Sequence, residues 1–330
     1  MPGHPHPGPV VAVSGSEGVL GRRVSTELAG RADVLPVDAR GPDVVARLTG
    51  ASCFVHLDPE PVERPGLDVA GARAEAAIAR RLLAAATDAG VPAVVVLSSA
   101  VVHGAWPDNP VPLTESAPVR PNPDFPFGAR CAELERLAAE WAGDAEARRA
   151  AVLRPAPVVG AGPGLATWLR IGWPVRWAEA EPPVQLLHVD DLAAAVALAA
   201  TEPLDGPYAV APDGWLEPAG VRALAGVPSA SVPVPGRLRT ALTARRVPPA
   251  VPAYASHPWV VANDRLRTAG WTPRATNEEA YVATHAGAPW SRVSPRRRQD
   301  VILGAAAAGV LAVPLAAAAA LRRSRRRRGL

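Results

Sequence analysis

Lysine is absent from this sequence, and all 35 basic residues are arginine. A proton relay that depends on a lysine ammonium is therefore excluded, because the arginine guanidinium keeps its proton. Cysteine is almost absent as well: Cys53 and Cys131 are the only two, and their spacing fits neither a metal site nor a disulfide framework. Such low cysteine usage is typical of a protein in a reducing cytosol.

The opening segment, MPGHPHPGP, has neither a positively charged stretch nor an apolar run. It does not fit a secretory signal, and we expect residues 1–9 to be a disordered N-terminus rather than a metal site built on their histidines. With 330 residues, of which 48% are hydrophobic, the chain is long enough to bury one large core, or a core and a smaller lobe.

Glycine, by contrast, forms a regular pattern near the start. Gly15, Gly18 and Gly21 follow an apolar run that ends at Ser14, which predicts a buried strand, a tight turn and then a helix over 22–28. In a dinucleotide-binding turn, glycine lets the backbone approach the pyrophosphate, and the helix N-terminus faces the anion. A glycine-rich turn without a ligand is the alternative. The residues expected to contact the ligand are Gly15, Ser16, Glu17, Gly18, Val19, Leu20 and Gly21.

A carboxylate follows the next apolar run at an informative distance. Residues 34–37 end at Asp38, 17 residues after Gly21, where dinucleotide-binding folds place an acid that binds the ribose hydroxyls of NAD. A solvated acid at a strand end is the alternative without function. Arg40 lies two residues further on and would instead suit the 2′-phosphate of NADP. The sequence therefore favours NAD and leaves NADP open.

Short apolar runs alternate with helical stretches along the first half of the chain. Strands are predicted over 10–13, 34–37, 53–57 and 94–97 and from 151–153, and helices over 22–28, 75–89 and 131–142. This alternation is typical of an α/β fold with a parallel sheet covered by helices on both faces.

Six segments, taken in order, carry a resemblance to a known family. They read SGSEGVLG, FVHLDP, DAGVPAVVVLSSAVVHG, VLRPAPVVGAGPG, LLHVDDLAAAV and NDRLRTAGWTPRATNEEA. Together they resemble the extended short-chain dehydrogenases, which include the NAD-dependent epimerases and dehydratases of nucleotide sugars. The resemblance implies a Rossmann-type doubly wound sheet over 10–287 that binds NAD, with a smaller substrate lobe mainly over 155–287. It also places Leu57, Asp58 and Ser98 beside the cofactor.

The resemblance identifies the positions at which the family carries out its chemistry. A tyrosine hydroxyl exchanges a proton with the substrate oxygen, and a lysine four residues later lowers the pKa of that tyrosine and holds the ribose. Here Phe127 and Cys131 stand at these two positions, and Ser99 stands where the family has its serine. Phenylalanine has no proton to give, and cysteine supplies no fixed positive charge. The three tyrosines lie far down the chain, at Tyr208, Tyr254 and Tyr281.

His103 is the remaining candidate for proton transfer, because imidazole titrates near neutrality. A hydrogen-bonded loop histidine is the alternative, and Asp58 either pairs with His103 or caps a turn. Two functions stay open. The first is an NAD(P)-binding protein without the family's redox chemistry, a pseudoenzyme acting as sensor, scaffold or partner subunit. The second is an active epimerase, dehydratase or reductase that acts on a nucleotide sugar or related carbonyl compound through Ser99 and His103.

The C-terminal tail differs in composition from the rest of the chain. Residues 301–321 are free of charge and would span about 31 Å as a helix, at ~1.5 Å per residue, which matches a bilayer core. Ten arginines against Asp300 give residues 292–330 a charge of +9, whereas 25 arginines against 30 acids give residues 1–291 a charge of −5. We expect a linker over 288–300, an apolar membrane-associated helix over 301–321 and an Arg-rich tail over 322–330 that contacts anionic lipids. This places the protein at the cytoplasmic face of a membrane, with a soluble tail or an interaction segment as the alternative.

The sequence also bears on nucleic-acid, metal and protein partners. No nucleic-acid partner is expected, because no aromatic or groove-reading element accompanies the arginines of the tail. His188, Asp190 and Asp191 would suit a metal, but their resemblance to the family's His-Val-Asp-Asp segment implies a structural role. The helices predicted over 75–89 and 131–142 resemble the family's helix pair, which implies a homodimer.

Overall fold

Six parallel strands form the central sheet of the computed structural model, in the order β2-β1-β3-β4-β5-β8. The structure describes residues 8–57, 63–169, 181–225 and 251–285. The strands are β1 (Val10–Ser14), β2 (Asp33–Val37), β3 (Cys53–His56), β4 (Ala93–Leu97), β5 (Arg149–Pro155) and β8 (Gly206–Val210). The order reverses beside β1, since β2 lies on one side of it and β3 on the other. Such a switch point opens a crevice at the carboxyl ends of the strands, where α/β proteins bind ligands.

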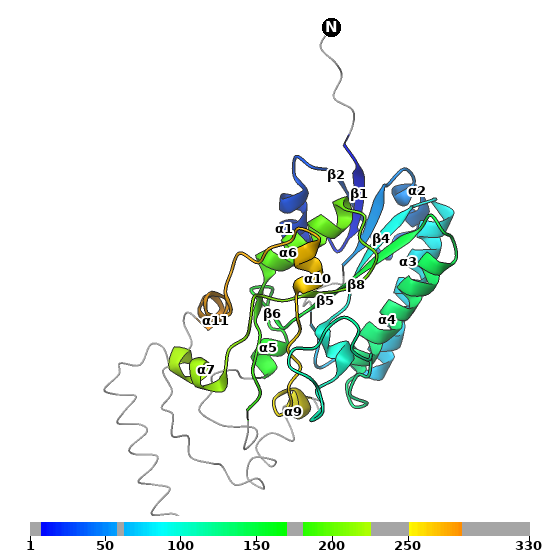
Figure 1. Ribbon diagram of the computed structural model, residues 1–330. Helices are drawn as coiled ribbons and strands as arrows, with labels where there is room; N and C mark the ends of the chain where they lie inside the picture. The colour runs from blue at the N-terminus through cyan, green and yellow to red at the C-terminus, as the bar shows by residue number, and fades with distance from the viewer. Residues whose placement is uncertain (1–7, 58–62, 170–180, 226–250, 286–330) are drawn as a thin grey trace, which may run out of the picture. The chain divides into compact units, whose positions relative to one another are not determined.

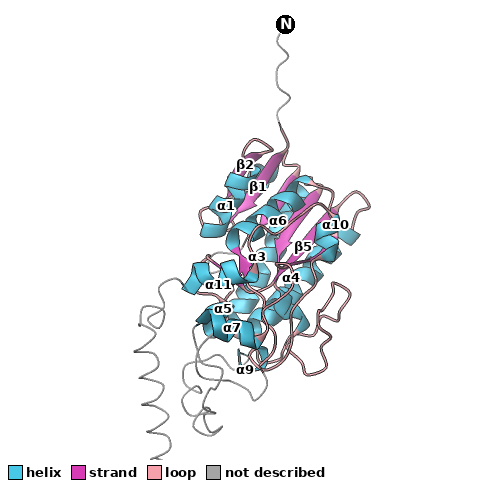
Figure 2. Ribbon diagram, turned by 60° about the vertical axis from the view of Figure 1, so that its left-hand side comes forward, coloured by secondary structure: helices cyan, strands magenta, loops and turns pink. Residues whose placement is uncertain are grey.

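Helices cover both faces of this sheet (Figures 1 and 2). The helices α1 (Val19–Leu28) and α6 (Val189–Thr201) pack together on one face, and α2 (Val44–Leu48), α3 (Val69–Asp88) and α4 (Pro126–Gly143) cover the other. Successive strand residues point to opposite faces, so Val11 and Val13 join the core under α1 and Ala12 joins the core under α3. The strands read as continuous apolar runs because both of their faces are buried.

Shorter elements complete the described part. They are η1 (Ala100–His103), β6 (Val158–Val159), α5 (Leu165–Trp168), β7 (Leu187–His188), α7 (Pro218–Ala225), α9 (Val251–Tyr254), α10 (Asp264–Thr268) and α11 (Asn277–His285), with β6 and β7 paired in parallel. The contacts divide the chain into two units, one of residues 1–229 with 233–284 and the other of 230–232 with 285–330. The sheet, the helices on its two faces and the cavity described below all belong to the first unit.

The predicted α/β fold with a parallel sheet is confirmed, and the differences concern helix starts. The helix expected over 75–89 begins at Val69, because the Asp68 carboxylate caps it by accepting the Gly71 N–H at 2.7 Å. The helix expected over 131–142 begins at Pro126, whose ring suits a first helical turn.

Several expectations fall on residues outside the described ones. These are the disordered N-terminus over residues 1–7, Asp58, the linker 288–300, the apolar helix 301–321 and the Arg-rich tail 322–330. Within the described part of the chain, no helix is both long enough and apolar enough to cross a bilayer.

Candidate functional site

The glycine turn joins β1 to α1 in the way the sequence predicts. Gly15 has a φ of 70°, in the left-handed region, and its carbonyl accepts the Gly18 N–H at 3.2 Å. Gly21 lies in the first turns of α1, where an added Cβ would stand 2.2 Å from the Gly15 carbonyl oxygen. The turn and the helix therefore approach each other as closely as only glycine allows. This places the N-terminus of α1 at the carboxyl end of β1, which is where dinucleotide-binding folds hold an anion.

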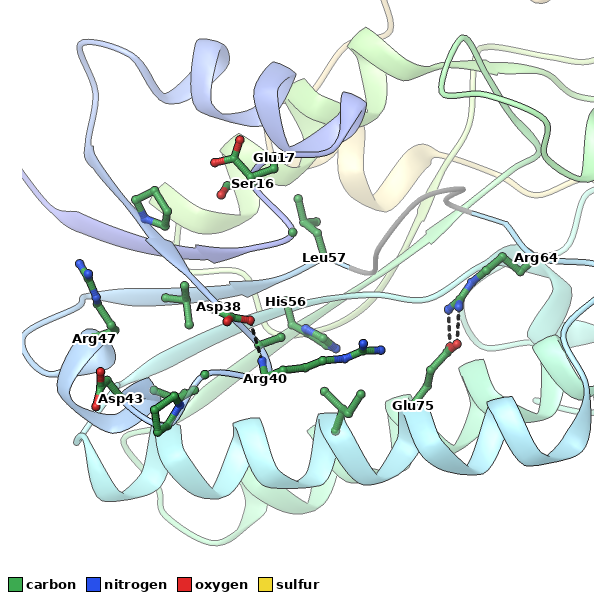
Figure 3. A pocket seen from close by; sticks show the side chains of 18 residues that line it. Ser16, Glu17, Asp38, Arg40, Asp43, Arg47, His56, Leu57, Arg64 and Glu75 are labelled. Carbon is green, nitrogen blue, oxygen red and sulfur yellow. Dashed lines mark hydrogen bonds and ion pairs between the residues drawn. The ribbon is translucent and has the colours of Figure 1, made fainter.

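A cavity of about 810 Å³ opens beside this turn (Figure 3). Six of the residues expected to contact a dinucleotide line it: Gly15, Ser16, Glu17, Asp38, Arg40 and Leu57. The lining also includes side chains that sequence reasoning did not assign to it, among them Asp43, Arg47, His56, Arg64, Glu75 and Ile78. Gly18, Val19, Leu20, Gly21 and Ser98 do not line this cavity. Gly18 and Gly21 shape its wall instead, through the turn geometry described above.

Asp38 and Arg40 both line the cavity from the loop that follows the last residue of β2. The Asp38 Oδ1 accepts the Arg40 N–H at 2.9 Å, which fixes the loop between them. Arg81 of α3 donates to the Ala39 carbonyl oxygen and holds the same loop from below. The Arg40 side chain extends along the cavity between Asp38 and α3 (Figure 3). The structure thus keeps both candidates for recognising the ribose, the carboxylate of Asp38 and the guanidinium of Arg40.

His56 ends β3 and was not assigned to the site from the sequence. Its Nδ1 lies 2.9 Å from the Ser14 Oγ, and the two residues are register partners in adjacent strands. The pair joins the carboxyl ends of β1 and β3 beneath the glycine turn. A lone histidine inside the apolar run 53–57 was the only signal in the sequence.

The opposite end of the cavity is lined by an ion-pair cluster. Arg64 donates both of its terminal nitrogens to the two oxygens of Glu75 on α3 (Figure 3). Arg130 of α4 is buried and places its Nε 3.3 Å from the Glu75 Oε2. Both carboxylate oxygens of Glu75 are therefore engaged by arginine. The sequence offered no signal for this cluster, because its members come from three separate segments.

Phe127 and Cys131 lie inside an aromatic core. They are 1% and 0% exposed, and the Phe127 ring lies 5.8 Å from that of Phe125. Phe125 in turn lies 5.1 Å from Tyr254, whose ring meets Trp259 edge-on at 5.0 Å. The phenylalanine and the thiol are thus packing residues within this cluster.

Tyr254 is the residue that sequence reasoning missed most clearly. The sequence places it far from Ser99 and Phe127, yet α9 brings its hydroxyl to the Val101 carbonyl oxygen, to which it donates at 2.9 Å. Val101 also donates its N–H to the Ser99 Oγ at 3.4 Å, so the Ser99 hydroxyl caps η1. Burial raises the pKa of Tyr254 well above its ordinary value, which keeps the hydroxyl protonated. No local sequence pattern signals a contact between residues so far apart.

His103 is 1% exposed and is hydrogen-bonded through both ring nitrogens. Its Nδ1 lies 3.1 Å from the Pro118 carbonyl oxygen, and because a carbonyl only accepts, Nδ1 carries the proton. Nε2 then accepts from the Arg154 Nη1 at 3.4 Å. Burial, followed by the charge of Arg154, lowers the pKa of His103, so the ring is neutral. This geometry favours the hydrogen-bonded loop histidine.

Ser98 belongs to the buried network beneath His103. Its Oγ donates to the Glu135 Oε1 at 2.6 Å, and Arg154 binds the same carboxylate through Nε at 3.0 Å and Nη2 at 2.7 Å. The side chains of Glu135 and Arg154 are 10% and 5% exposed. The Ser98 hydroxyl thus links the end of β4 to α4, and the expected contact of Ser98 with the cofactor stays a prediction.

The acidic segment at the start of α6 makes structural contacts. His188 caps the helix by accepting the Asp190 N–H at 3.3 Å, and Asp190 pairs with Arg23 of α1. Asp191 accepts the backbone N–H groups of Arg274 at 2.9 Å and Ala275 at 3.0 Å. Among the residues that the structure describes, no group of histidine, cysteine and acidic side chains is arranged to hold a metal ion.

Comparisons with known proteins agree with this geometry. The sequence model of the NAD dependent epimerase/dehydratase family matches residues 11–211. No curated protein compared with the sequence matches it. MoeE5 in complex with UDP-glucose and NAD is similar with a TM-score of 0.61 and 21% identity, over 86% of this chain and 98% of that one.

Two further solved structures show the same similarity. The UDP-glucose 4-epimerase of Thermus thermophilus in complex with NAD has a TM-score of 0.60 and 19% identity, over 84% of this chain and 99% of that one. DesIV, a dTDP-glucose 4,6-dehydratase from Streptomyces venezuelae with NAD and TYD bound, has a TM-score of 0.60 and 19% identity, over 86% of this chain and 97% of that one. At these identities the likeness shows a shared fold.

Proposed function

Because the chain belongs to the NAD-dependent epimerase/dehydratase family, we propose that it binds a nicotinamide adenine dinucleotide and does not carry out the family's redox chemistry. The observation that carries the proposal is the contrast between two places. The glycine cradle, in which a Cβ at Gly21 would meet the Gly15 carbonyl oxygen at 2.2 Å, opens on a cavity of about 810 Å³. Phe127 and Cys131, which the sequence resemblance aligns with the family's tyrosine and lysine, are buried in an aromatic core.

The residues of the cavity have separate tasks in this proposal. The N–H groups at the start of α1 bind the pyrophosphate. The pyrophosphate can approach them because Gly21 packs closely on the turn. Asp38 accepts hydrogen bonds from the ribose hydroxyls, which favours NAD, whereas Arg40 offers a partner for the 2′-phosphate of NADP. Solved structures of the same fold, such as MoeE5, hold NAD together with a nucleotide sugar.

The proposed lack of chemistry rests on proton handling. A bound nicotinamide ring supplies hydride transfer, but a carbonyl or hydroxyl substrate also needs a group that exchanges its proton. Phe127 has no such proton, Cys131 supplies no positive charge, Ser99 caps η1 and His103 has both ring nitrogens engaged. The protein therefore acts as a sensor, scaffold or partner subunit, tethered through residues 301–321 to the cytoplasmic face of a membrane. The homodimer expected through α3 and α4 stays a prediction.

The test compares binding with exchange. NADH fluorescence measured on the purified full chain should show saturable binding, while isotope exchange at the nicotinamide C4 should be absent. Gly21→Ala should weaken binding at least tenfold and lower the free energy of unfolding by about 1–3 kcal/mol, because the backbone of the turn has to move. Gly143→Ala is the matched control, since its added Cβ meets no heavy atom within 4 Å. Hydride exchange at an ordinary enzymatic rate that is lost in His103→Ala would overturn the proposal in favour of an active enzyme.

A further inference from the structure

We propose that the cavity recognises the adenosine diphosphate half of its ligand and gains little from the nicotinamide half, so that ADP-ribose binds about as well as NAD. This inference rests on the proposed function, because it concerns the same cavity. The two ends of the cavity differ in the groups that they offer to a ligand (Figure 3).

The adenosine end presents groups suited to a ligand. Asp38 and Arg40 follow β2, and Asp43 and Arg47 lie at the start of α2 and within it, all lining the cavity. The glycine turn, which would hold the pyrophosphate, lies next to them (Figure 3). A ribose and two phosphates thus find two carboxylates, two guanidinium groups and the N-terminus of α1 along this part of the cavity.

The other end of the cavity presents groups that already have partners. Both Glu75 oxygens are engaged, by the two terminal nitrogens of Arg64 and by the Arg130 Nε at 3.3 Å. A ribose hydroxyl placed here would have to displace one of these ion pairs.

The segment that would clamp the second ribose is closed off as well. Ser99, Phe127 and Cys131 are each 1% exposed or less, and none of them lines the cavity. The Tyr254 hydroxyl, which lies nearby, donates to the Val101 carbonyl oxygen. These side chains fill their volume with packing contacts, so a nicotinamide riboside gains no charged or hydrogen-bonding partner from them.

A site built in this way reads the adenine nucleotide and not its redox state. NAD, NADH and ADP-ribose share the adenosine diphosphate half, and they differ only where the described residues offer few free partners. The proposed sensor would accordingly respond to the summed concentration of such nucleotides.

Isothermal titration calorimetry on the full chain tests this inference with defined probes. We expect the Kd values of NAD, NADH and ADP-ribose to agree within about threefold, and nicotinamide mononucleotide to bind at least about a hundredfold more weakly. NAD binding that is more than about tenfold tighter than ADP-ribose binding would overturn the inference and leave the proposed function standing. Failure of all of these nucleotides to bind would overturn both.

A variant pair checks that the adenosine end carries the affinity. Asp38→Asn keeps the acceptor for the Arg40 N–H but removes the charge, and it should weaken NAD and ADP-ribose by the same factor, about tenfold. Asp33→Asn, at the exposed start of the same strand, is the control and should change neither Kd. A loss confined to NAD, or no loss with either ligand, would contradict the assignment.

Discussion

The carboxyl group of Glu63 is wholly enclosed by the protein. One of its oxygens accepts the Leu165 N–H at 2.9 Å, while the other has no hydrogen-bond partner among the described residues. A Cβ at Gly164 would stand 2.8 Å from the accepting oxygen, so the chain after β6 packs directly on this carboxyl. Burial raises the pKa of Glu63 to about 8, and the group is therefore protonated at neutral pH.

We predict that this carboxyl makes the protein less stable as the pH rises from about 4.5 to about 8. In that window the folded state holds one proton more than the unfolded state, so the free energy of unfolding falls with pH and levels off above it. The expected loss is on the order of 1–4 kcal/mol, measured by urea unfolding at pH 5.5 and pH 8.5.

Glu63→Gln keeps an acceptor for the Leu165 N–H but cannot ionise. The free energy of unfolding of this variant should no longer fall between pH 5.5 and pH 8.5, and at pH 8.5 the variant should be more stable than the parent. Glu140→Gln, an exposed change on α4, serves as the control and should keep the parent's decline. If the Glu63 variant keeps it too, the carboxyl does not titrate as described.

At the scale of elements, α4 and β5 are held together by a buried ion pair. Arg154 of β5 makes two hydrogen bonds to Glu135 of α4, at 3.0 and 2.7 Å, and the Ser98 hydroxyl that follows β4 donates to the same carboxylate. Removing one partner of such a pair leaves a desolvated charge, which costs more than the pair itself contributes. The network therefore fixes how α4 lies on the sheet.

We predict that Glu135→Ala lowers the free energy of unfolding by about 3–5 kcal/mol, because Arg154 then stays buried without its carboxylate. Chemical unfolding monitored by tryptophan fluorescence measures the change. Glu133→Ala, on the same helix but in surface pairs with Arg80 and Arg136, should have a far smaller effect. Equal losses of unfolding free energy in the two variants would contradict the view that burial of the Glu135–Arg154 pair makes its loss costly.

For the whole molecule, the strongest feature is the separation of charge. Residues 1–291 carry −5, from 25 arginines and 30 acids, and residues 292–330 carry +9, from ten arginines and one acid. An acidic body and a basic tail respond in opposite ways to a negatively charged surface. The uncharged stretch 301–321 lies between the arginine groups of this tail.

We predict that the full chain sediments with vesicles containing anionic lipid and that a chain ending at residue 291 does not. Binding should weaken in high salt, because screening removes the attraction of the arginines, but a part should remain from the apolar stretch. Vesicles of neutral lipid are the control for the charge contribution. Equal sedimentation of the full and shortened chains would exclude the tail as the membrane anchor.

The sequence by itself determined the features that depend on neighbouring residues. The strands were predictable because burial on both faces produces continuous apolar runs, as in residues 94–97. The glycine turn was predictable because only glycine tolerates the 70° φ of Gly15 and the contact at Gly21. The absence of lysine is a fact of composition that no folding can change.

Only the tertiary structure decided which of the candidate groups have partners. Tyr254 reaches Val101 across 153 positions of sequence, and Glu75 meets Arg130 on a different helix. His103 is neutral because burial, and then the charge of Arg154, lower its pKa. Such contacts join segments that are remote along the chain, and protonation depends on the groups and solvent around each side chain. Long-range contacts and protonation states leave no local pattern in the sequence, so only the tertiary structure could determine them.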